Sequence, residues 1–348
     1  MNTKKDILGF TYQELKDIAI ENNLKPFLAK QVYDWIYKKR INSFSEMTNI
    51  SKNSISFLEN NFSFKLLNLK IKQVDKFDET TKFLFELDDK NLIETVLMKF
   101  DYGYSVCVTT QVGCNMGCSF CASGLLKKKR NLEVAEIVGQ VYYVQKYLDQ
   151  NYNHARLSNI VVMGIGEPFD NFDNLINFIK IVNDDNGLQI GARKITVSTC
   201  GLVKKIDEWS KIMPQIGLAI SLHAPNNEIR NKIMPINRAY DINQVIEAAK
   251  RYTNITNRRI TFEYIMLKGV NDSNKNAIDL AHLLKGMLCY VNLIPYNPVN
   301  EHSYQRSENV TDFANTLSRL GIQVTIRQEK GKKIDAACGQ LRAKNEQK

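Results

Sequence analysis

The chain has 348 residues, of which 44% are hydrophobic and 24% are charged, and its formal net charge at pH 7 is +10. This is the composition of an ordinary globular protein, and the length allows one large domain and a smaller one. Apolar stretches such as residues 216–222 are too short to cross a bilayer, and the first lysines are not followed by the apolar run of a signal peptide. These features argue against a membrane protein and against a secreted one.

The excess of basic residues and the spacing of the cysteines indicate the class of protein more closely. A net charge of +10 favours a polyanionic partner such as RNA or DNA, although a lysine-rich proteome would produce the same excess. Three of the seven cysteines fall within eight residues. In a reducing compartment such crowding favours metal-binding or catalytic cysteines over a disulfide scaffold. We therefore expect a cytoplasmic protein and favour nucleic acid as its partner.

Residues 1–62 are predicted to form a small helical accessory domain, and residues 63–102 a β-rich linker. The first range contains YQELKDIAIEN, FLAKQVYDWIYKKR and SKNSISFLENNF, with apolar residues near helical spacing. In the linker, KLLNLKIKQVDKF, KFLFELDD and LIETVLMKF alternate with polar turns, which indicates strands. The basic runs 38–40 and 127–130 could form a surface for phosphate groups, although a solvated charge run explains each of them equally well.

From residue 103 to residue 348, strand patterns alternate with helical ones. Strands are predicted in SVCVTTQVG, NIVVMG, KITVST, IGLAISLH, RITFEYIML, YVNLIP and IQVTIR. This alternation implies a parallel sheet with crossover helices, and six or seven such units predict an α/β fold that forms a partial (β/α) barrel. The chemistry of such a barrel lies at the carboxyl ends of its strands. We therefore expect the functional site in the loops that follow these segments.

Cys114, Cys118 and Cys121 form a C-x3-C-x2-C loop directly after the first of these strands. Three thiolates at this spacing can surround one soft metal centre. A structural zinc site requires a fourth ligand, whereas a [4Fe–4S] cluster held by three cysteines keeps one iron open for another ligand. Three cysteines buried without a metal are the plainer alternative, but loops rarely bury thiols. We therefore predict that these cysteines bind a [4Fe–4S] cluster.

The cysteine loop resembles that of the radical S-adenosylmethionine superfamily, in which the same spacing follows the first barrel strand. Four further segments extend the resemblance in order along the chain: VVMGIGEPFDN, SLHAPNNEIRNKIMPINR, NLIPYNP and IDAACGQLRAK. Together they are similar to the adenine C2 methyltransferase family (RlmN), which acts on 23S rRNA at the peptidyl transferase centre and on certain tRNAs next to the anticodon. The resemblance covers roughly the whole chain. It implies a partial barrel of the radical S-adenosylmethionine type with a small N-terminal helical domain, residues 1–62, that binds RNA.

The resemblance also implies a binding site for S-adenosylmethionine, of which two molecules are used per turnover. It assigns this site to Gly166, Glu167, Ser198, Ser221, Leu222, His223 and Asn297. A carboxylate suits the methionyl ammonium group, and serine and asparagine offer short hydrogen-bonding groups for the ribose and the carboxylate. Taken alone, the glycine turn around Gly166 is an ordinary loop, and His223 is more often a structural histidine.

Three further residues receive catalytic roles from the resemblance. Cys338 would form S-methylcysteine, Cys107 would later form a transient disulfide with Cys338, and Glu94 would accept the C2 proton of adenine. By themselves these residues permit other interpretations, because Cys107 suits a small buried hydrophobe and strand alternation places Glu94 toward solvent. The glycine and alanine neighbours of Cys338 favour an approachable thiol. Cys200 and Cys289 match no role and are expected in the core.

The implied reaction is a radical methylation of RNA. One S-adenosylmethionine methylates the cysteine, and reductive cleavage of a second supplies the radical that activates this methyl group for addition to adenine. The implied partners are 23S rRNA, tRNA and a reductive electron donor such as flavodoxin or ferredoxin, and the chain is expected to act as a monomer without a membrane.

Two alternatives remain open. The related adenine C8 methyltransferase, which confers ribosomal antibiotic resistance, shares the cluster cysteines, the cysteine pair and the fold. The Glu167-Pro168 dipeptide and the QLRAK segment near the end favour the C2 family. The second alternative is an RNA-binding protein without enzymatic activity whose cysteine loop binds zinc. Such a protein would be colourless and would not cleave S-adenosylmethionine.

Overall fold

The computed structural model describes residues 4–125, 127–298, 303–331, 333–335 and 339–346. Parallel strands form the centre of the fold, in the segments where the strand patterns were expected. They are β6 (Gly103–Cys107), β9 (Leu157–Val162), β10 (Ile195–Thr199), β11 (Gly217–Ser221), β12 (Ile260–Met266), β13 (Cys289–Pro295) and β14 (Val324–Ile326). The expected parallel α/β sheet is therefore confirmed.

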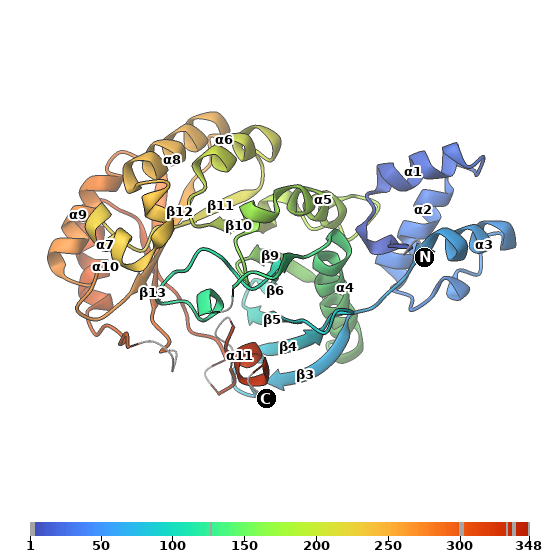
Figure 1. Ribbon diagram of the computed structural model, residues 1–348, viewed down its shortest axis with the longest axis horizontal. Coiled ribbons are helices and arrows are strands. Elements are labelled where there is room, and N and C mark those ends of the chain that lie inside the picture. The colour runs from blue at the N-terminus through green and yellow to red at the C-terminus, as the bar shows by residue number, and fades with distance from the viewer. Residues whose placement is uncertain (1–3, 126, 299–302, 332, 336–338, 347–348) are drawn as a thin grey trace.

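Helices connect these strands and cover the outer side of the sheet (Figure 1). They are α4 (Val134–Asn151), α5 (Phe172–Asn183), α6 (Val203–Ile212), α7 (Asn227–Ile233), α8 (Ile242–Thr256), α9 (Asn274–Leu284) and α10 (Val310–Arg319). The longer helices pack through an apolar stripe at helical spacing, as Val245, Ala249 and Tyr252 do on α8. The short α7 instead buries Arg230 and Ile233. Within the described ranges, no helix combines the length and the apolar character needed to span a bilayer.

Three antiparallel strands extend the same sheet beyond β6. They are β3 (Asn68–Val74), β4 (Thr81–Glu86) and β5 (Leu92–Phe100). The complete order is β14-β13-β12-β11-β10-β9-β6-β5-β4-β3, so β14 and β3 are the two edges and the barrel stays open. Phe83 and Phe85 of β4 pack edge to face with Tyr143 of α4, which covers this extension on its outer side. Residues 63–102 therefore continue the central sheet.

The N-terminal residues form a small helical unit beside α4 (Figure 1). Its elements are β1 (Lys5–Asp6), α1 (Tyr12–Glu21), α2 (Leu28–Tyr33), a π-helical turn (Asp34–Lys39), α3 (Lys52–Asn61) and β2 (Phe62–Ser63), which pairs with β1. Arg40 forms an ion pair with Asp149 of α4, and the Tyr142 hydroxyl donates a hydrogen bond to the Ile41 carbonyl. These contacts attach the helical unit to the first crossover helix of the barrel.

The two faces of the sheet have different surroundings, because successive side chains of a strand point to opposite sides. The Thr95 hydroxyl of β5 donates a hydrogen bond to the Gln140 side chain of α4 (2.8 Å), so this side faces the helix. Glu94 therefore points to the other, inner side. Because Val96 pairs in register with Cys107 of β6, the side chains of Glu94, Val96 and Cys107 share the inner face.

Candidate active site

The residues singled out in the sequence gather at the carboxyl ends of neighbouring strands. The cysteine loop follows β6 and the short β7 (Gln111–Val112), and the Gly-Ile-Gly-Glu-Pro turn follows β9. Ser198 lies near the end of β10, Ser221 ends β11, and Asn297 lies two residues beyond β13. The carboxyl ends of parallel strands meet at one edge of a sheet, so these loops form one site.

The cysteine loop is shaped by two glycines. Gly113 and Gly117 have φ angles of 79° and 65°, a region that other residues rarely adopt. The Cys121 N–H donates to the Cys118 carbonyl (3.2 Å) and closes a turn. Cys114, like these two cysteines, is half-buried. The glycines therefore let three thiols be carried on one short loop at the strand ends.

The three thiols are close enough to influence one another. Burial and the charge of Cys121 raise the pKa of Cys114 to about 11, and burial and both neighbouring thiols raise the pKa of Cys118 further. Thiolates are the form that binds metals, and bound iron would offset this burial and repulsion. In the described part of the chain, no three His, Cys, Asp or Glu side chains are arranged to hold a single metal ion. In a cluster each cysteine binds a different iron, and this donor set fits such a group.

The turn after β9 requires glycine at two positions. A Cβ atom on Gly164 would lie 2.6 Å from the Val108 carbonyl oxygen, and one on Gly166, whose φ is 110°, would lie 2.7 Å from the Gln111 side chain. The Gln111 side-chain oxygen accepts a hydrogen bond from the Glu167 N–H (2.8 Å). The turn is therefore pressed against the chain that leads into the cysteine loop.

The Glu167 side chain is buried, and both of its carboxylate oxygens accept backbone hydrogen bonds. The donors are the N–H groups of Phe169 (3.0 Å) and Cys200 (2.7 Å). Burial raises the pKa of Glu167, and these hydrogen bonds partly offset the rise. In this structure the carboxylate ties the turn after β9 to the turn after β10.

The turns after β10 and β11 also meet. The hydroxyl oxygens of Ser198 and Ser221 lie 3.4 Å apart on these adjacent strands. The N–H groups of Leu222 and His223 both donate to the Glu263 carbonyl of β12 (3.1 and 3.2 Å), which fixes where the chain leaves β11. The structure therefore brings four of the predicted cofactor-binding residues together.

His223 is buried in its neutral form beside the cysteine loop. Its Nδ1 accepts a hydrogen bond from the Ile265 N–H (3.1 Å), so the ring proton lies on Nε2. Burial and then the charge of Arg230 lower the pKa of His223 to about 3. The ring packs edge to face with Phe120, with centroids 4.9 Å apart. His223 therefore offers a neutral hydrogen-bond donor at the strand ends.

This burial makes the stability of the protein sensitive to acid. In the unfolded chain His223 regains its ordinary pKa near 6.5, so below that pH the unfolded state binds a proton that the folded state excludes until about pH 3. We expect acidification from pH 7 to pH 5 to remove about 2 kcal/mol of unfolding free energy through this residue. Urea unfolding at both pH values should show that the unfolding free energy of His223→Gln falls by about 2 kcal/mol less than that of the wild type. The matched control is His154→Gln, because His154 is exposed. Equal pH sensitivity in all three proteins would contradict the assignment.

The other predicted residues lie around the same edge. Cys107 is half-buried at the end of β6, and burial raises the pKa of its thiol while the charge of Arg327 partly offsets the rise. Asn297 is exposed in the turn after β13. Cys338 lies outside the described residues, so its distance from Cys107 is not defined. Cys200 and Cys289 are buried in the core, as expected.

Glu94 is buried, so the interpretation that strand alternation places it toward solvent is wrong. Its Oε2 lies 2.9 Å from Nζ of Lys82 on β4, and the two side chains are 2% and 0% exposed. Oε2 also accepts a hydrogen bond from the Gly339 N–H (2.7 Å), and Oε1 accepts one from the Arg342 N–H (2.6 Å). Gly339 directly follows Cys338 in the sequence. The structure thus connects the carboxylate to the loop that contains Cys338.

Three buried charged residues near the site were missed in the sequence: Lys82, Arg230 and Glu263. Glu263 shares the inner face with Ser221, with which it pairs in register, and its Oε2 accepts a hydrogen bond from the Asn292 side chain (2.9 Å). Burial raises its pKa. An acid within the apolar pattern RITFEYIML is the signal that could have identified it.

The basic run that follows the cysteine loop is partly engaged within the chain. Lys128 pairs with Asp170 (2.7 Å), and Arg130 pairs with Asp89 (2.6 Å), whereas Lys127 is exposed. A phosphate-binding surface on this run would therefore contain fewer unpaired charges than the sequence suggests.

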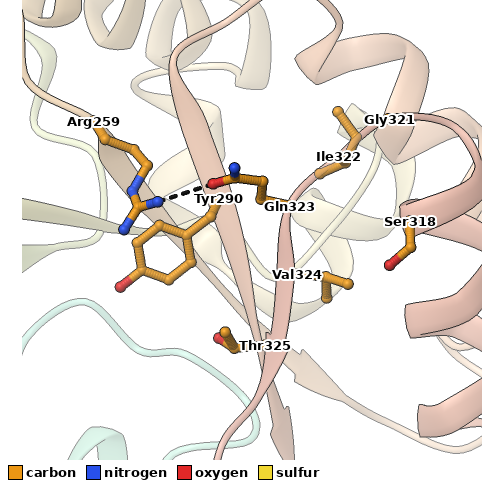
Figure 2. A pocket seen from close by; sticks show the side chains of 8 residues that line it. All are labelled: Arg259, Tyr290, Ser318, Gly321, Ile322, Gln323, Val324 and Thr325. Atoms are coloured by element: carbon orange, nitrogen blue, oxygen red, sulfur yellow. Dashed lines mark hydrogen bonds between the residues drawn. The ribbon is translucent and has the colours of Figure 1, made fainter.

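A separate pocket of about 700 Å³ lies at the opposite, amino ends of β13 and β14 (Figure 2). Arg259 stacks on the Tyr290 ring, 4.5 Å from its centroid, and donates a hydrogen bond to the Gln323 side chain (2.8 Å). None of the predicted site residues lines this pocket. It is therefore distinct from the site at the carboxyl ends.

Two family models match the chain. Residues 108–281 match the radical SAM superfamily, and residues 5–62 match the ribosomal RNA large subunit methyltransferase N-terminal domain. The first range spans β9 to β12 with the cysteine loop, and the second covers the helical unit.

Similar proteins match over nearly their whole length. A probable dual-specificity RNA methyltransferase RlmN of Malacoplasma penetrans is 57% identical over 97% of this chain and 96% of its own. That of Spiroplasma citri is 55% identical, with 98% of each chain covered. The crystal structure of a radical SAM methyltransferase from Sphaerobacter thermophilus superposes with a TM-score of 0.91 at 40% identity, covering 97% of this chain and 98% of that one.

Proposed function

Because this chain belongs to the RlmN family of the radical S-adenosylmethionine superfamily, we propose that it methylates carbon 2 of adenine in RNA. Its substrates would be 23S rRNA, at the peptidyl transferase centre, and tRNA, at the adenine next to the anticodon. The observation that carries the proposal is the contact between Glu94 and Gly339, because it joins the proposed base to the loop of the proposed methyl carrier.

The cofactors of this superfamily are a [4Fe–4S] cluster and S-adenosylmethionine, and the residues at the strand ends suit both. Cys114, Cys118 and Cys121 would hold the cluster, which supplies the electron for reductive cleavage of S-adenosylmethionine. The cofactor would lie against Gly166, Glu167, Ser198, Ser221, Leu222, His223 and Asn297. The hydroxyl pair and the Nε2–H of the histidine give this surface the donors that a ribose or a carboxylate needs.

Three further side chains would carry out the transfer of the methyl group. Cys338 would carry the methyl group as S-methylcysteine, taken from the first of two S-adenosylmethionine molecules per turnover. Glu94 would accept the proton from C2 of adenine once the carbon has added there. Cys107 would then attack the sulfur of Cys338, so that an S–S bond forms, the C–S bond breaks and the methylated RNA leaves.

The proposal extends to partners and organisation. Residues 1–62 would form an RNA-binding accessory domain, residues 63–102 would carry the base into the barrel, and residues 103–348 would form the catalytic domain with the C-terminal cysteine loop. A flavodoxin or ferredoxin would deliver the electron, and the chain would act as a monomer. A reducing cytoplasm suits both the RNA substrates and the free thiols.

Mass spectrometry of RNA tests this function and its nearest competitor together. We expect 23S rRNA and tRNA from cells that carry the gene to contain 2-methyladenosine, and RNA from a deletion strain to lack it. Recovery of 8-methyladenosine instead would identify the adenine C8 activity. Complementation with the wild-type gene is the control, and RNA that is identical with and without the gene would contradict both assignments.

Anaerobic purification tests the non-enzymatic alternative. We expect an iron–sulfur absorption band and release of 5′-deoxyadenosine from S-adenosylmethionine under reducing conditions. A colourless, zinc-containing protein that leaves S-adenosylmethionine intact would favour an RNA-binding protein stapled by zinc.

A further inference from the structure

Lys82 is the only lysine among the described residues whose side chain is buried from solvent. A buried ammonium group is unfavourable unless a partner compensates its charge. Lys82 pairs in register with Val96 of β5, two residues from Glu94, so the two side chains are diagonal neighbours on the inner face. A long side chain can bridge such a diagonal. The sheet register therefore brings lysine and glutamate together.

The pair holds the chain on both sides of the segment that contains Cys338. Lys82 Nζ lies 2.9 Å from Glu94 Oε2 and also donates a hydrogen bond to the Asp335 carbonyl (2.5 Å). The same carboxylate oxygen accepts the Gly339 N–H (2.7 Å). The lysine therefore contacts the residue that precedes 336–338, and the glutamate contacts the residue that follows.

We infer that Lys82 is a positioning residue for Glu94 in the transfer of the methyl group. The ammonium group of Lys82, 2.9 Å from the carboxylate, holds it by a charge-assisted hydrogen bond. Three donors on one carboxylate also fix its orientation, because charge-assisted hydrogen bonds are short and directional. The inference rests on the proposed function, in which Glu94 removes the C2 proton after the carbon has added to adenine.

A purely structural role predicts different behaviour. If Lys82 only fastened the C-terminal segment, its loss would impair every step that uses Cys338, including methylation of that cysteine. If it acts through Glu94, its loss blocks only the step at which the proton leaves C2. The RNA would then stay covalently attached to Cys338, because release follows removal of the proton.

The test uses the reconstituted holoenzyme carrying Lys82→Met, a substitution that keeps the length and removes the charge. We expect cleavage of S-adenosylmethionine and methylation of Cys338, followed by mass spectrometry of the protein, to stay within about threefold of wild type. We expect the yield of 2-methyladenosine to fall at least about 100-fold, the usual contribution of a positioned base. A protein–RNA adduct should accumulate on denaturing gels. Lys82→Arg should recover at least about tenfold of the lost yield, because the charge is kept.

Three comparisons decide the outcome. Lys70→Met is the matched control, since Lys70 on β3 is exposed and pairs with Glu86, and it should behave as wild type. The double variant Lys82→Met/Glu94→Gln should lose no more activity than Glu94→Gln alone.

Two results for Lys82→Met overturn the inference. One is methylation of RNA at the normal rate, and the other is loss of Cys338 methylation together with absence of the protein–RNA adduct. If Lys82→Met does not fold, Lys82→Gln replaces it, and failure of both to fold also overturns it. Wild-type enzyme without 2-methyladenosine would instead contradict the proposed function.

Discussion

Substitution of Cys338 by alanine is expected to abolish methylation of RNA while S-adenosylmethionine is still cleaved reductively. The thiol is the only proposed carrier of the new carbon, so its loss removes the reaction path. In the proposed assignment the cleavage would depend on the cysteine loop 114–121 and on the turns after β9, β10 and β11, to which Cys338 does not belong in the sequence. Formation of 5′-deoxyadenosine and of 2-methyladenosine can be measured in one reaction mixture. We expect the first to persist and the second to fall below detection.

Cys289→Ala is the matched control for this experiment. Cys289 is a buried cysteine at the start of β13, at the opposite end from the cysteine loop, and the substitution should leave both products unchanged. Methylation of RNA at a normal rate by Cys338→Ala would rule out the S-methylcysteine route. Loss of both products would show instead that the C-terminal loop is needed to build the cofactor site.

The barrel could be predicted from the sequence because its signal is local. Each parallel strand is a short apolar run, and the helices between the strands repeat apolar residues at helical spacing. The cysteine triplet was equally local, since all three proposed ligands fall on one loop. These features need no knowledge of which segments meet in space.

The surroundings of Glu94 could not be predicted in this way. Alternation shows that an acid points away from its apolar neighbours, but it does not show whether that side meets water. Here the inner face is covered by α11 (Gln340–Glu346), whose Leu341 packs against Leu84 and Leu92. The role of Lys82 could not be predicted for a similar reason, because Lys82 and Asp335, whose carbonyl it contacts, are 253 positions apart in the sequence.

Arg230 was also part of a recognised motif without an assigned role, and the structure supplies one. The side chain is fully buried and links three segments at the strand ends. Its guanidinium donates hydrogen bonds to the Cys200 carbonyl (2.7 Å), the Asn237 side chain (2.8 Å) and the Tyr240 carbonyl (3.1 Å). The Cys200 N–H in turn donates to Glu167. Arg230 therefore supports the turn to which Glu167, the residue proposed to bind S-adenosylmethionine, is anchored.

Substitution of Arg230 by methionine is expected to lower the free energy of unfolding by about 3–5 kcal/mol, since several buried acceptors lose their donor at once. Urea unfolding measures this loss, and equilibrium dialysis should show weaker binding of S-adenosylmethionine because the anchor of Glu167 loosens. Arg251→Met is the matched control: Arg251 pairs with Asp207 on the surface, so its removal should change stability by less than about 1 kcal/mol. Equal losses of unfolding free energy in the two variants would mean that the hydrogen bonds of Arg230 only offset the cost of burying its charge. A stability loss confined to Arg230→Met, together with weaker cofactor binding, would instead show that one buried guanidinium holds the cofactor-binding turns in place.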